Sequence, residues 1–201
     1  MAVNYTVRAD VFDIQVDSPQ QGDIFLVDTN VWYWLTYPPA SLSAPYQLSY
    51  SSYITATITA NATLCCSGLS LAELAHLIER EEQKLSSYSS VKSKEYRHNY
   101  PSARAKVVSE VQAAWNQVKN IYALLITVTL DEATADAALT RFSTQCLDGY
   151  DLFILESMSQ ESLTKIITDD GDYVTVPGIQ VFTANPGAIA AARNQGKLIT
   201  R

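Results

Sequence analysis

The chain has 201 residues, enough for one sizeable hydrophobic core, and nothing in its length requires a second domain. Hydrophobic residues make up 47% of it and charged residues 17%, a balance typical of globular rather than disordered proteins. The net charge of -7 argues against a protein that coats polyanions in general, although a local basic face is compatible with it.

Hydropathy and the N-terminus give no indication of export. No apolar stretch approaches the roughly 20 uncharged residues that span a bilayer, so no membrane partner is expected. The first residues alternate polar and apolar side chains and include early acids, unlike a secretion signal, which predicts a cytoplasmic protein. Cys65, Cys66 and Cys146 are too few for a disulfide framework and lack the Cys-x-x-Cys spacing of zinc sites.

The N-terminal region reads as an addition to the main domain. Residues 4–16 alternate like a strand or hairpin at the edge of a sheet, and the turn-forming run Ser18–Gly22 ends that pattern. We therefore treat residues 1–22 as a strand extension of the same domain, which continues through residues 23–201.

The next run is the clearest strand in the sequence. Ile24–Val27 is wholly apolar, as in central parallel strands that are covered on both faces. It ends at Asp28, and Thr29 or Asn30 is expected to cap the following helix. Pro38-Pro39 must end that helix.

The middle of the chain alternates helix and strand. Residues 44–59 favour a helix, although their Tyr, Thr and Ile content would also suit a strand. Residues 61–67 form a second apolar strand. Ser70 and Glu73 then match a capping box at the start of a helix, and the Ser-rich run 86–90 ends it.

The second half continues the alternation of helices and strands. We expect helices at 101–122, from Asp131 toward Cys146, at 151–158 and at 186–195, and strands at 125–130, 164–168 and 179–182. Strands alternating with helices predict an α/β fold, a three-layer α/β/α sandwich around a mainly parallel central sheet.

Acidic side chains collect where these strands end and helices begin. In a parallel sheet the residues just past the strands project into one crevice. Carboxylates brought together there need shared protons or a bound cation. An all-oxygen set suits magnesium or manganese better than zinc. The acids at these positions are Asp28, Glu73, Asp151, Asp170 and Asp172.

These segments, in order, resemble the four acidic blocks of PIN-domain nucleases, a family whose small bacterial members include VapC-type toxins. The resemblance covers roughly residues 23–185 and rests on Asp28-Thr29-Asn30-Val31, Ser70–Leu74, Asp151–Met158, and Thr168–Tyr173 followed by Pro177–Val181. It implies the PIN fold, a site for Mg²⁺ or Mn²⁺, and hydrolysis of RNA phosphodiester bonds to a 5′-phosphate and a 3′-hydroxyl.

The resemblance also implies roles for individual residues. Asp28, Glu73, Asp151 and Asp170 would be the catalytic, metal-binding quartet, with Asp172 as a fifth metal ligand. Thr29 or Asn30 would orient the first aspartate, and Thr168 would donate a hydrogen bond near the metal. Asp148 lies three residues before Asp151 and could share its helical face, so either could be the third ligand.

Each acid also has a purely structural interpretation. Asp28 could serve as a helix N-cap. The capping box accounts for Glu73 without any chemistry. Residues 169–172 could form no more than a polar turn. It is the order of the whole set that favours a metal site.

A second candidate region is basic. Half of the 14 Lys and Arg residues lie between positions 80 and 106, interleaved with tyrosines. Such a stretch could bind single-stranded RNA, with phosphates on the cations and bases on the rings. The four residues assigned to RNA binding are Lys92, Lys94, Arg97 and Arg104. A solvated pair of helices, with nearby glutamates offsetting the charge, would explain the stretch equally well.

Three functions compete at this stage. The first is a divalent-metal-dependent endoribonuclease, in some members of the family the toxin of a type II toxin-antitoxin pair. The second is a catalytically silent PIN-like scaffold that binds RNA or protein. The third, a receiver-like phosphoacceptor, ranks last because no lysine follows the late strand before Lys197. RNA is the expected substrate, and an antitoxin protein and a second copy of the chain are candidate partners.

Overall fold

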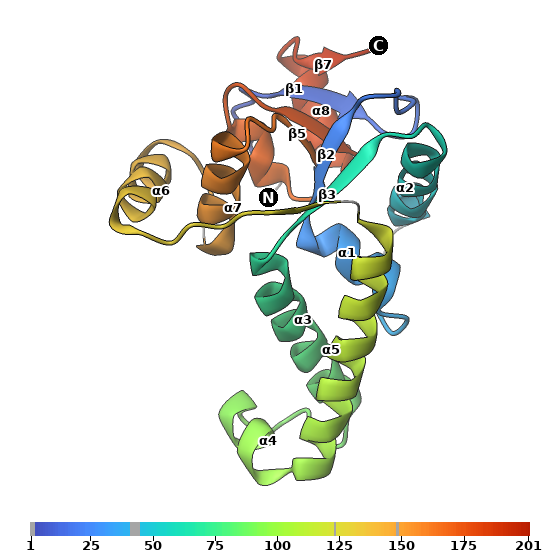
Figure 1. The fold of residues 1–201 in the computed structure, drawn as a ribbon, viewed down its shortest axis with the longest axis vertical. Coiled ribbons are helices and arrows are strands. Elements are labelled where there is room, and N and C mark those ends of the chain that lie inside the picture. Colours follow the sequence, from blue (N-terminus) through green and yellow to red (C-terminus); the bar gives the residue numbers. More distant parts are fainter. Residues whose placement is uncertain (1–2, 41–44, 123, 148) are drawn as a thin grey trace.

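The computed structural model describes residues 3–40, 45–122, 124–147 and 149–201. Its centre is one sheet of seven parallel strands in the order β4-β3-β2-β5-β6-β1-β7 (Figure 1). The strands are β1 (Asp10–Asp13), β2 (Ile24–Val27), β3 (Thr63–Ser67), β4 (Leu124–Ile126), β5 (Lys165–Ile167), β6 (Gln180–Thr183) and β7 (Leu198–Ile199). The predicted α/β fold with a parallel sheet is confirmed.

Helices connect the strands and cover both faces of the sheet. The α-helices are α1 (Thr29–Thr36), α2 (Leu48–Thr59), α3 (Leu69–Leu85), α4 (Ser93–Asn99), α5 (Pro101–Ile121), α6 (Glu132–Thr144), α7 (Gly149–Gln160) and α8 (Pro186–Asn194). Two 3₁₀ turns accompany them, η1 (Pro45–Gln47) and η2 (Gly171–Thr175).

The two cores follow from the alternation of side chains along each strand. On β2, Leu26 points into one core together with residues of α6, α7, α8 and η2. Phe25 and Val27 point into the other core, with residues of α1, α2, α3 and α5. Because both faces are covered, the central strands are apolar throughout, as the sequence indicated.

Helices α3, α4 and α5 form an arm that extends away from the sheet (Figure 1). Tyr96 of α4 is buried, and Ala114 and Val118 of α5 belong to the second core. The sequence predicted α3 and α5. It did not predict α4, a seven-residue helix between the serine-rich run and Pro101.

The N-terminal extension joins the far side of the sheet. Of residues 4–16, only Asp10–Asp13 form a strand, and β1 pairs in parallel with β6 and β7. The hairpin alternative is therefore wrong, because a hairpin would require an antiparallel partner. Strand β7, which the sequence did not predict, lies outside β1 and makes it an interior strand.

Two predicted caps are wrong. The N-cap of α1 is Asp28 itself, whose carboxylate accepts a hydrogen bond from the Thr29 backbone, and not Thr29 or Asn30. Helix α3 begins at Leu69 after Gly68, so Ser70 lies inside it and the predicted capping box does not form. Glu73 is therefore left without its simplest structural explanation.

Other boundaries changed by a few residues. Residues 45–59 are helical as favoured, with a 3₁₀ turn before α2, and residue 44 lies outside the described part of the chain. The strand expected at 125–130 is limited to β4, because only three residues pair with β3. Within the described residues, no helix is long and apolar enough to cross a membrane.

Candidate active site at the carboxyl edge of the sheet

Asp28 stands at the end of the most central apolar run. Its side chain follows β2 directly and is 5% exposed. One carboxylate oxygen accepts from the Thr29 backbone N–H at 2.7 Å and the other accepts from the Thr168 hydroxyl at 2.6 Å. Both oxygens are thus held by groups of the adjacent strand ends, because β2 and β5 are neighbours in the sheet.

Thr168 connects the first aspartate to the loop after β5. Its hydroxyl, fully buried, accepts from the Asp170 backbone N–H at 2.9 Å while it donates to Asp28. The Asn30 amide reaches the same hydroxyl at 3.4 Å, and its oxygen accepts from the Asp169 backbone N–H at 3.4 Å. Thr168 contacts Asp28 directly, whereas Asn30, one of the two residues predicted to orient this aspartate, contacts Thr168 instead.

Asp151 approaches the site from α7, on the face of the sheet opposite α1. Its carboxylate accepts a hydrogen bond from the Tyr173 hydroxyl at 2.8 Å. Tyr173 comes from η2 and is fully buried. Burial, together with the charges of Asp28 and Asp151, raises the pKa of this phenol well above its usual value, so Tyr173 is a permanent donor.

Asp170 and Asp172 belong to the loop that follows β5. Asp170 caps η2, with one carboxylate oxygen accepting from the Asp172 backbone N–H at 2.8 Å. Asp169 turns away from the acidic site, toward the hydroxyls of Tyr50 and Tyr46 at 2.8 and 3.4 Å. These contacts are consistent with the choice of Asp170, rather than Asp169, as the predicted metal ligand.

Three acids from three other elements act on the carboxylate of Asp28. Burial raises the pKa of Asp28 well above its ordinary value of 3.8, and the charges of Asp151, Glu73 and Asp170 raise it further. The Thr168 hydrogen bond acts in the opposite direction. Negative charge is therefore concentrated around buried Asp28. The groups that donate hydrogen bonds to Asp28 are a backbone amide and a hydroxyl, neither of them a cation.

The donor chemistry fits a hard divalent cation. The converging side chains offer carboxylate oxygens, the ligands that Mg²⁺ and Mn²⁺ prefer. The hydroxyl of Thr29, buried beside Asp28, makes no hydrogen bond within the described residues and is a further oxygen at this point. No group of three or more His, Cys, Asp or Glu side chains among the described residues is arranged as a ready-made metal cage. Magnesium commonly binds through one or two carboxylates and keeps several waters. The absence of a three-ligand cage among the described residues is therefore compatible with carboxylates that suit a divalent cation.

Comparison with known families decides what kind of fold surrounds these acids. A PIN domain family model matches residues 25–179, which is most of the chain. The chain belongs to the PIN domain family. PIN domains are generally nucleases, so the match supports a nuclease-type fold around the acidic edge of the sheet. No curated protein matches the chain.

The PIN match includes all four acidic positions, whereas β1 and β7 lie outside it. Asp148, the alternative to Asp151, lies outside the described residues. Asp151 itself forms part of the cluster through Asp28 and Tyr173. Tyr173 is the residue that the sequence analysis missed, because a tyrosine in a polar turn carries no sign that its hydroxyl will meet an acid on another helix.

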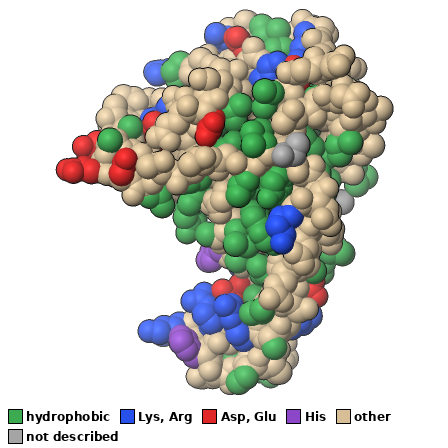
Figure 2. All heavy atoms as spheres, viewed as in Figure 1, with side chains coloured by type: hydrophobic (Ala, Val, Ile, Leu, Met, Phe, Trp, Pro, Cys, Tyr) green, Lys and Arg blue, Asp and Glu red, His purple; other side chains and the backbone are tan. Residues whose placement is uncertain are grey.

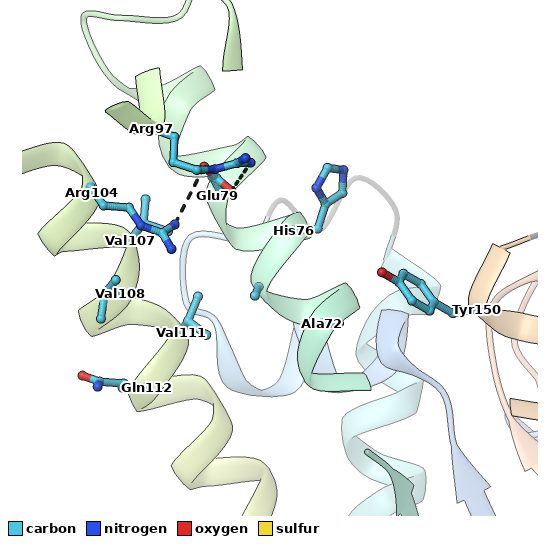
Figure 3. A pocket seen from close by; sticks show the side chains of 11 residues that line it. Ala72, His76, Glu79, Arg97, Arg104, Val107, Val108, Val111, Gln112 and Tyr150 are labelled. Atoms are coloured by element: carbon cyan, nitrogen blue, oxygen red, sulfur yellow. Dashed lines mark hydrogen bonds and ion pairs between the residues drawn. The ribbon is translucent and has the colours of Figure 1, made fainter. Parts of the chain in front are cut away.

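A groove opens between α3, α4, α5 and α7. It has a volume of about 690 Å³. Its walls include Ala72 and Tyr150, the chain neighbours of Glu73 and Asp151, while Val107, Val108 and Val111 of α5 form an apolar side (Figure 3). The groove therefore runs along the arm, and its lining includes the chain neighbours of Glu73 and Asp151 but not these two acids themselves.

Two of the four predicted RNA-binding residues line this groove. Arg97 donates to both oxygens of Glu79 at 2.7 and 2.8 Å, and Arg104 lies 3.8 Å from the same carboxylate (Figure 3). Both guanidinium side chains are more than 40% exposed. One glutamate thus orients two arginines, and their combined charge exceeds its own by one.

Lys92 and Lys94 lie farther out, on the exposed surface at the start of α4. They border a smaller hollow together with His98. Figure 2 shows basic and histidine side chains gathered at the free end of the arm, facing a hollow between the arm and the rest of the molecule. The basic stretch therefore presents cations on the side of the arm that also bears the groove.

Proposed function

We propose that this PIN domain is a divalent-metal-dependent endoribonuclease that hydrolyses phosphodiester bonds in single-stranded RNA. The observation that supports the proposal most strongly is the charge around Asp28. A buried carboxylate that feels three further acids from α3, α7 and the loop after β5 raises the free energy of the folded chain unless a cation or a proton offsets it.

The side chains of the cluster have separable tasks in this proposal. Asp28, Glu73, Asp151 and Asp170, with Asp172 as a further oxygen donor, would hold Mg²⁺ or Mn²⁺, one or two of them directly and the others through waters on the ion. The bound ion would supply an acidified water and neutralise charge on the phosphate. Thr168 fixes the rotamer of Asp28, and Tyr173 fixes that of Asp151. These two hydroxyls hold the carboxylates in place before any substrate arrives.

The groove along the arm supports RNA as the substrate. Arg97 and Arg104 present exposed guanidinium groups, and the apolar side with Tyr150 offers a surface for a splayed base. Lys92 and Lys94 extend the positive charge beyond the groove. A single strand would place its phosphates on the arm while its scissile bond lies at the acidic edge.

The alternative is a scaffold that binds RNA or a partner without cutting. The hydrogen bond between Asp28 and the Thr29 backbone favours it, because this bond gives the aspartate a structural role as a helix cap. The two functions make different predictions about Asp170 and Glu73, which a silent scaffold does not require as carboxylates.

The deciding experiment is a cleavage assay on labelled RNAs of mixed sequence with Mn²⁺ or Mg²⁺. We expect cleavage by the parent protein and a loss on the order of a hundredfold or more in Asp28→Asn and in Asp170→Asn. Asp131→Asn is the matched control, since Asp131 caps α6 and is not among the residues that act on Asp28. Equal cleavage by all four proteins would indicate a contaminating nuclease, and no cleavage by any would favour the scaffold.

A toxin role is a separate, finer proposal. If the protein is the toxin of a type II pair, its expression should arrest bacterial growth, and Asp28→Asn should not. A small DNA-binding protein encoded in the adjacent reading frame should restore growth when it is co-expressed. Size-exclusion chromatography with light scattering would show whether the chain also forms a homodimer.

A further inference from the structure

The N-terminal segment, residues 3–9, precedes the region that matches the PIN family but is firmly attached to it. Val7 donates its backbone N–H to the Gln195 side chain at 3.0 Å, and Gln195 donates back to the Tyr5 carbonyl at 2.8 Å. The backbone N–H groups of Arg8 and Ala9 both donate to the Val174 carbonyl, at 2.8 and 3.0 Å. The segment is thus fixed to α8 and to η2.

This attachment places the ring of Tyr5 against the acidic loop. A Cβ atom at position 171 would lie 2.7 Å from Cε1 of Tyr5 and closer still to its hydroxyl oxygen. Only glycine leaves room for the phenol at this position. Gly187 lies on the other side of the ring, where a Cβ atom would be 3.7 Å from Cε2. The hydroxyl end of Tyr5 therefore sits over the residue between Asp170 and Asp172.

The hydroxyl group is not needed for this packing. A phenylalanine ring would fill the same space between the two glycines. Tyr5 is only partly buried, and its surroundings are acidic: burial and the charges of Asp172, Asp170 and Asp169 raise the pKa of its phenol. The hydroxyl lies against Gly171, between Asp170 and Asp172, where it can donate a hydrogen bond.

We propose that Tyr5 is a substrate-contact residue whose hydroxyl donates a hydrogen bond to the RNA backbone next to the scissile phosphate. This inference rests on the proposed nuclease function and adds to it a residue from outside the PIN match. A neutral donor suits this place, because a lysine or arginine would be held in ion pairs by the acidic loop. The N-terminal segment would then complete the substrate site as well as extend the sheet.

The test compares Tyr5→Phe with Thr6→Ala, an exposed neighbour on the same segment. Binding of a fluorescein-labelled single-stranded RNA is measured by anisotropy in Ca²⁺, and cleavage kinetics are measured in Mn²⁺. Tyr5→Phe should raise both Kd and KM by roughly tenfold, as expected for a hydrogen bond to a charged group. Its kcat and melting temperature should match those of the parent, and Thr6→Ala should change none of these quantities.

Two results would overturn the inference about Tyr5, and both can be told apart from a failure of the proposed nuclease function. An unchanged Kd and KM in Tyr5→Phe would mean that the hydroxyl does not meet the substrate. A loss of affinity that parallels a lower melting temperature would mean that the residue is only structural. If the parent protein neither binds nor cleaves RNA, the proposed function itself is wrong and the inference falls with it.

A double-mutant cycle provides a second, independent test. Gly171→Ala should displace the Tyr5 ring and weaken RNA binding. In the Tyr5→Phe background the same change should weaken it no further, because the hydroxyl is already gone. Fully additive effects would contradict the proposal, since they would show that Gly171 acts on RNA binding without Tyr5.

Discussion

Buried acids of the arm pair with cationic side chains, whereas buried Asp28 at the carboxyl edge of the sheet accepts hydrogen bonds from a backbone amide and a hydroxyl. Glu79 is bound by Arg97 and Arg104, and Glu82 by Lys106 and the Tyr37 hydroxyl. Accordingly the hydrogen bond from Arg97 lowers the pKa of Glu79, whereas burial and three like charges raise that of Asp28. A buried carboxylate is stabilised by cations on the arm, whereas at the carboxyl edge nearby acids repel the charge of Asp28.

This difference separates the acids that pair with cations from Asp28. The chain has cations available and uses them on the arm, on Asp23 through Lys165 and Arg201, and on Glu156 through Arg141. The hydrogen bonds to Asp28 come from a hydroxyl and a backbone amide instead. A buried acid that is held by neutral groups, and whose pKa three further acids raise, is a candidate functional site.

The largest expected effect concerns the hydroxyl that holds the acidic edge together. Thr168→Val removes the donor to Asp28 and the acceptor of the Asp170 backbone N–H. We expect the cleavage rate to fall about a hundredfold, because two carboxylates lose their orientation. Thr57→Val is the matched control: this buried threonine bonds only to a carbonyl within α2, so the rate should not change. Equal rates in the two variants would show that Thr168 has no role in positioning.

The next prediction concerns the paired region. Glu82→Ala leaves the buried Tyr37 hydroxyl without its acceptor, and should lower the free energy of unfolding by about 2 kcal/mol. Glu81→Ala, which breaks only the pair with exposed Lys84, should cost less than about 1 kcal/mol. Both losses, measured by urea unfolding, should be the same in Mn²⁺ and in chelator. If either arm variant lost a different amount of stability in Mn²⁺ than in chelator, the proposed difference between the arm and the carboxyl edge would be wrong.

The two regions should also respond to pH with opposite signs in chelator. A raised folded pKa means that Asp28 stabilises the fold below its ordinary value of 3.8, and this stability is lost as pH rises through the folded pKa. Glu79, whose pKa is lowered, stabilises the fold above 4.5 and loses this effect as pH falls through its folded pKa.

Urea unfolding across a pH series would resolve these two contributions. Asp28→Asn should gain stability relative to the parent as pH rises, and Glu79→Gln should lose stability relative to the parent over the same change. Parallel pH profiles for the two variants would contradict the assignment of opposite environments.

The smallest expected effect is on RNA affinity along the arm. Arg97→Gln removes one exposed cation from the groove and should weaken binding of single-stranded RNA about threefold to tenfold at low salt. The salt dependence of binding should become shallower as well. Arg193→Gln, on exposed α8, is the control and should bind like the parent. Equal affinities would place the RNA elsewhere.

The sequence predicted the features that depend on short-range patterns. The apolar run Ile24–Val27, ending in Asp28, indicated a central strand that delivers an acid to the sheet edge, and the structure has it there. The strand that ends shortly before Asp170 and the helix containing Asp151 were predicted in the same way. The order of these acids along the chain was what indicated a PIN-like site.

Features that depend on distant contacts were missed. Nothing local to Tyr173 or Tyr5 indicates that their hydroxyls meet acids from other elements. Strand β7 is only two residues long and forms because β1 is adjacent to it. The capping box at Ser70 failed because α3 starts at Leu69, so Ser70 already lies inside the helix.

The most direct test of the central claim is a titration of the parent protein and Asp28→Asn with Mn²⁺, followed by melting temperature and by calorimetry. The account predicts that the parent binds the ion and becomes more stable, by about 2.7 kcal/mol at a hundred times the Kd, and that Asp28→Asn gains far less. A parent protein whose stability does not change with Mn²⁺ or Mg²⁺ at neutral pH would contradict it.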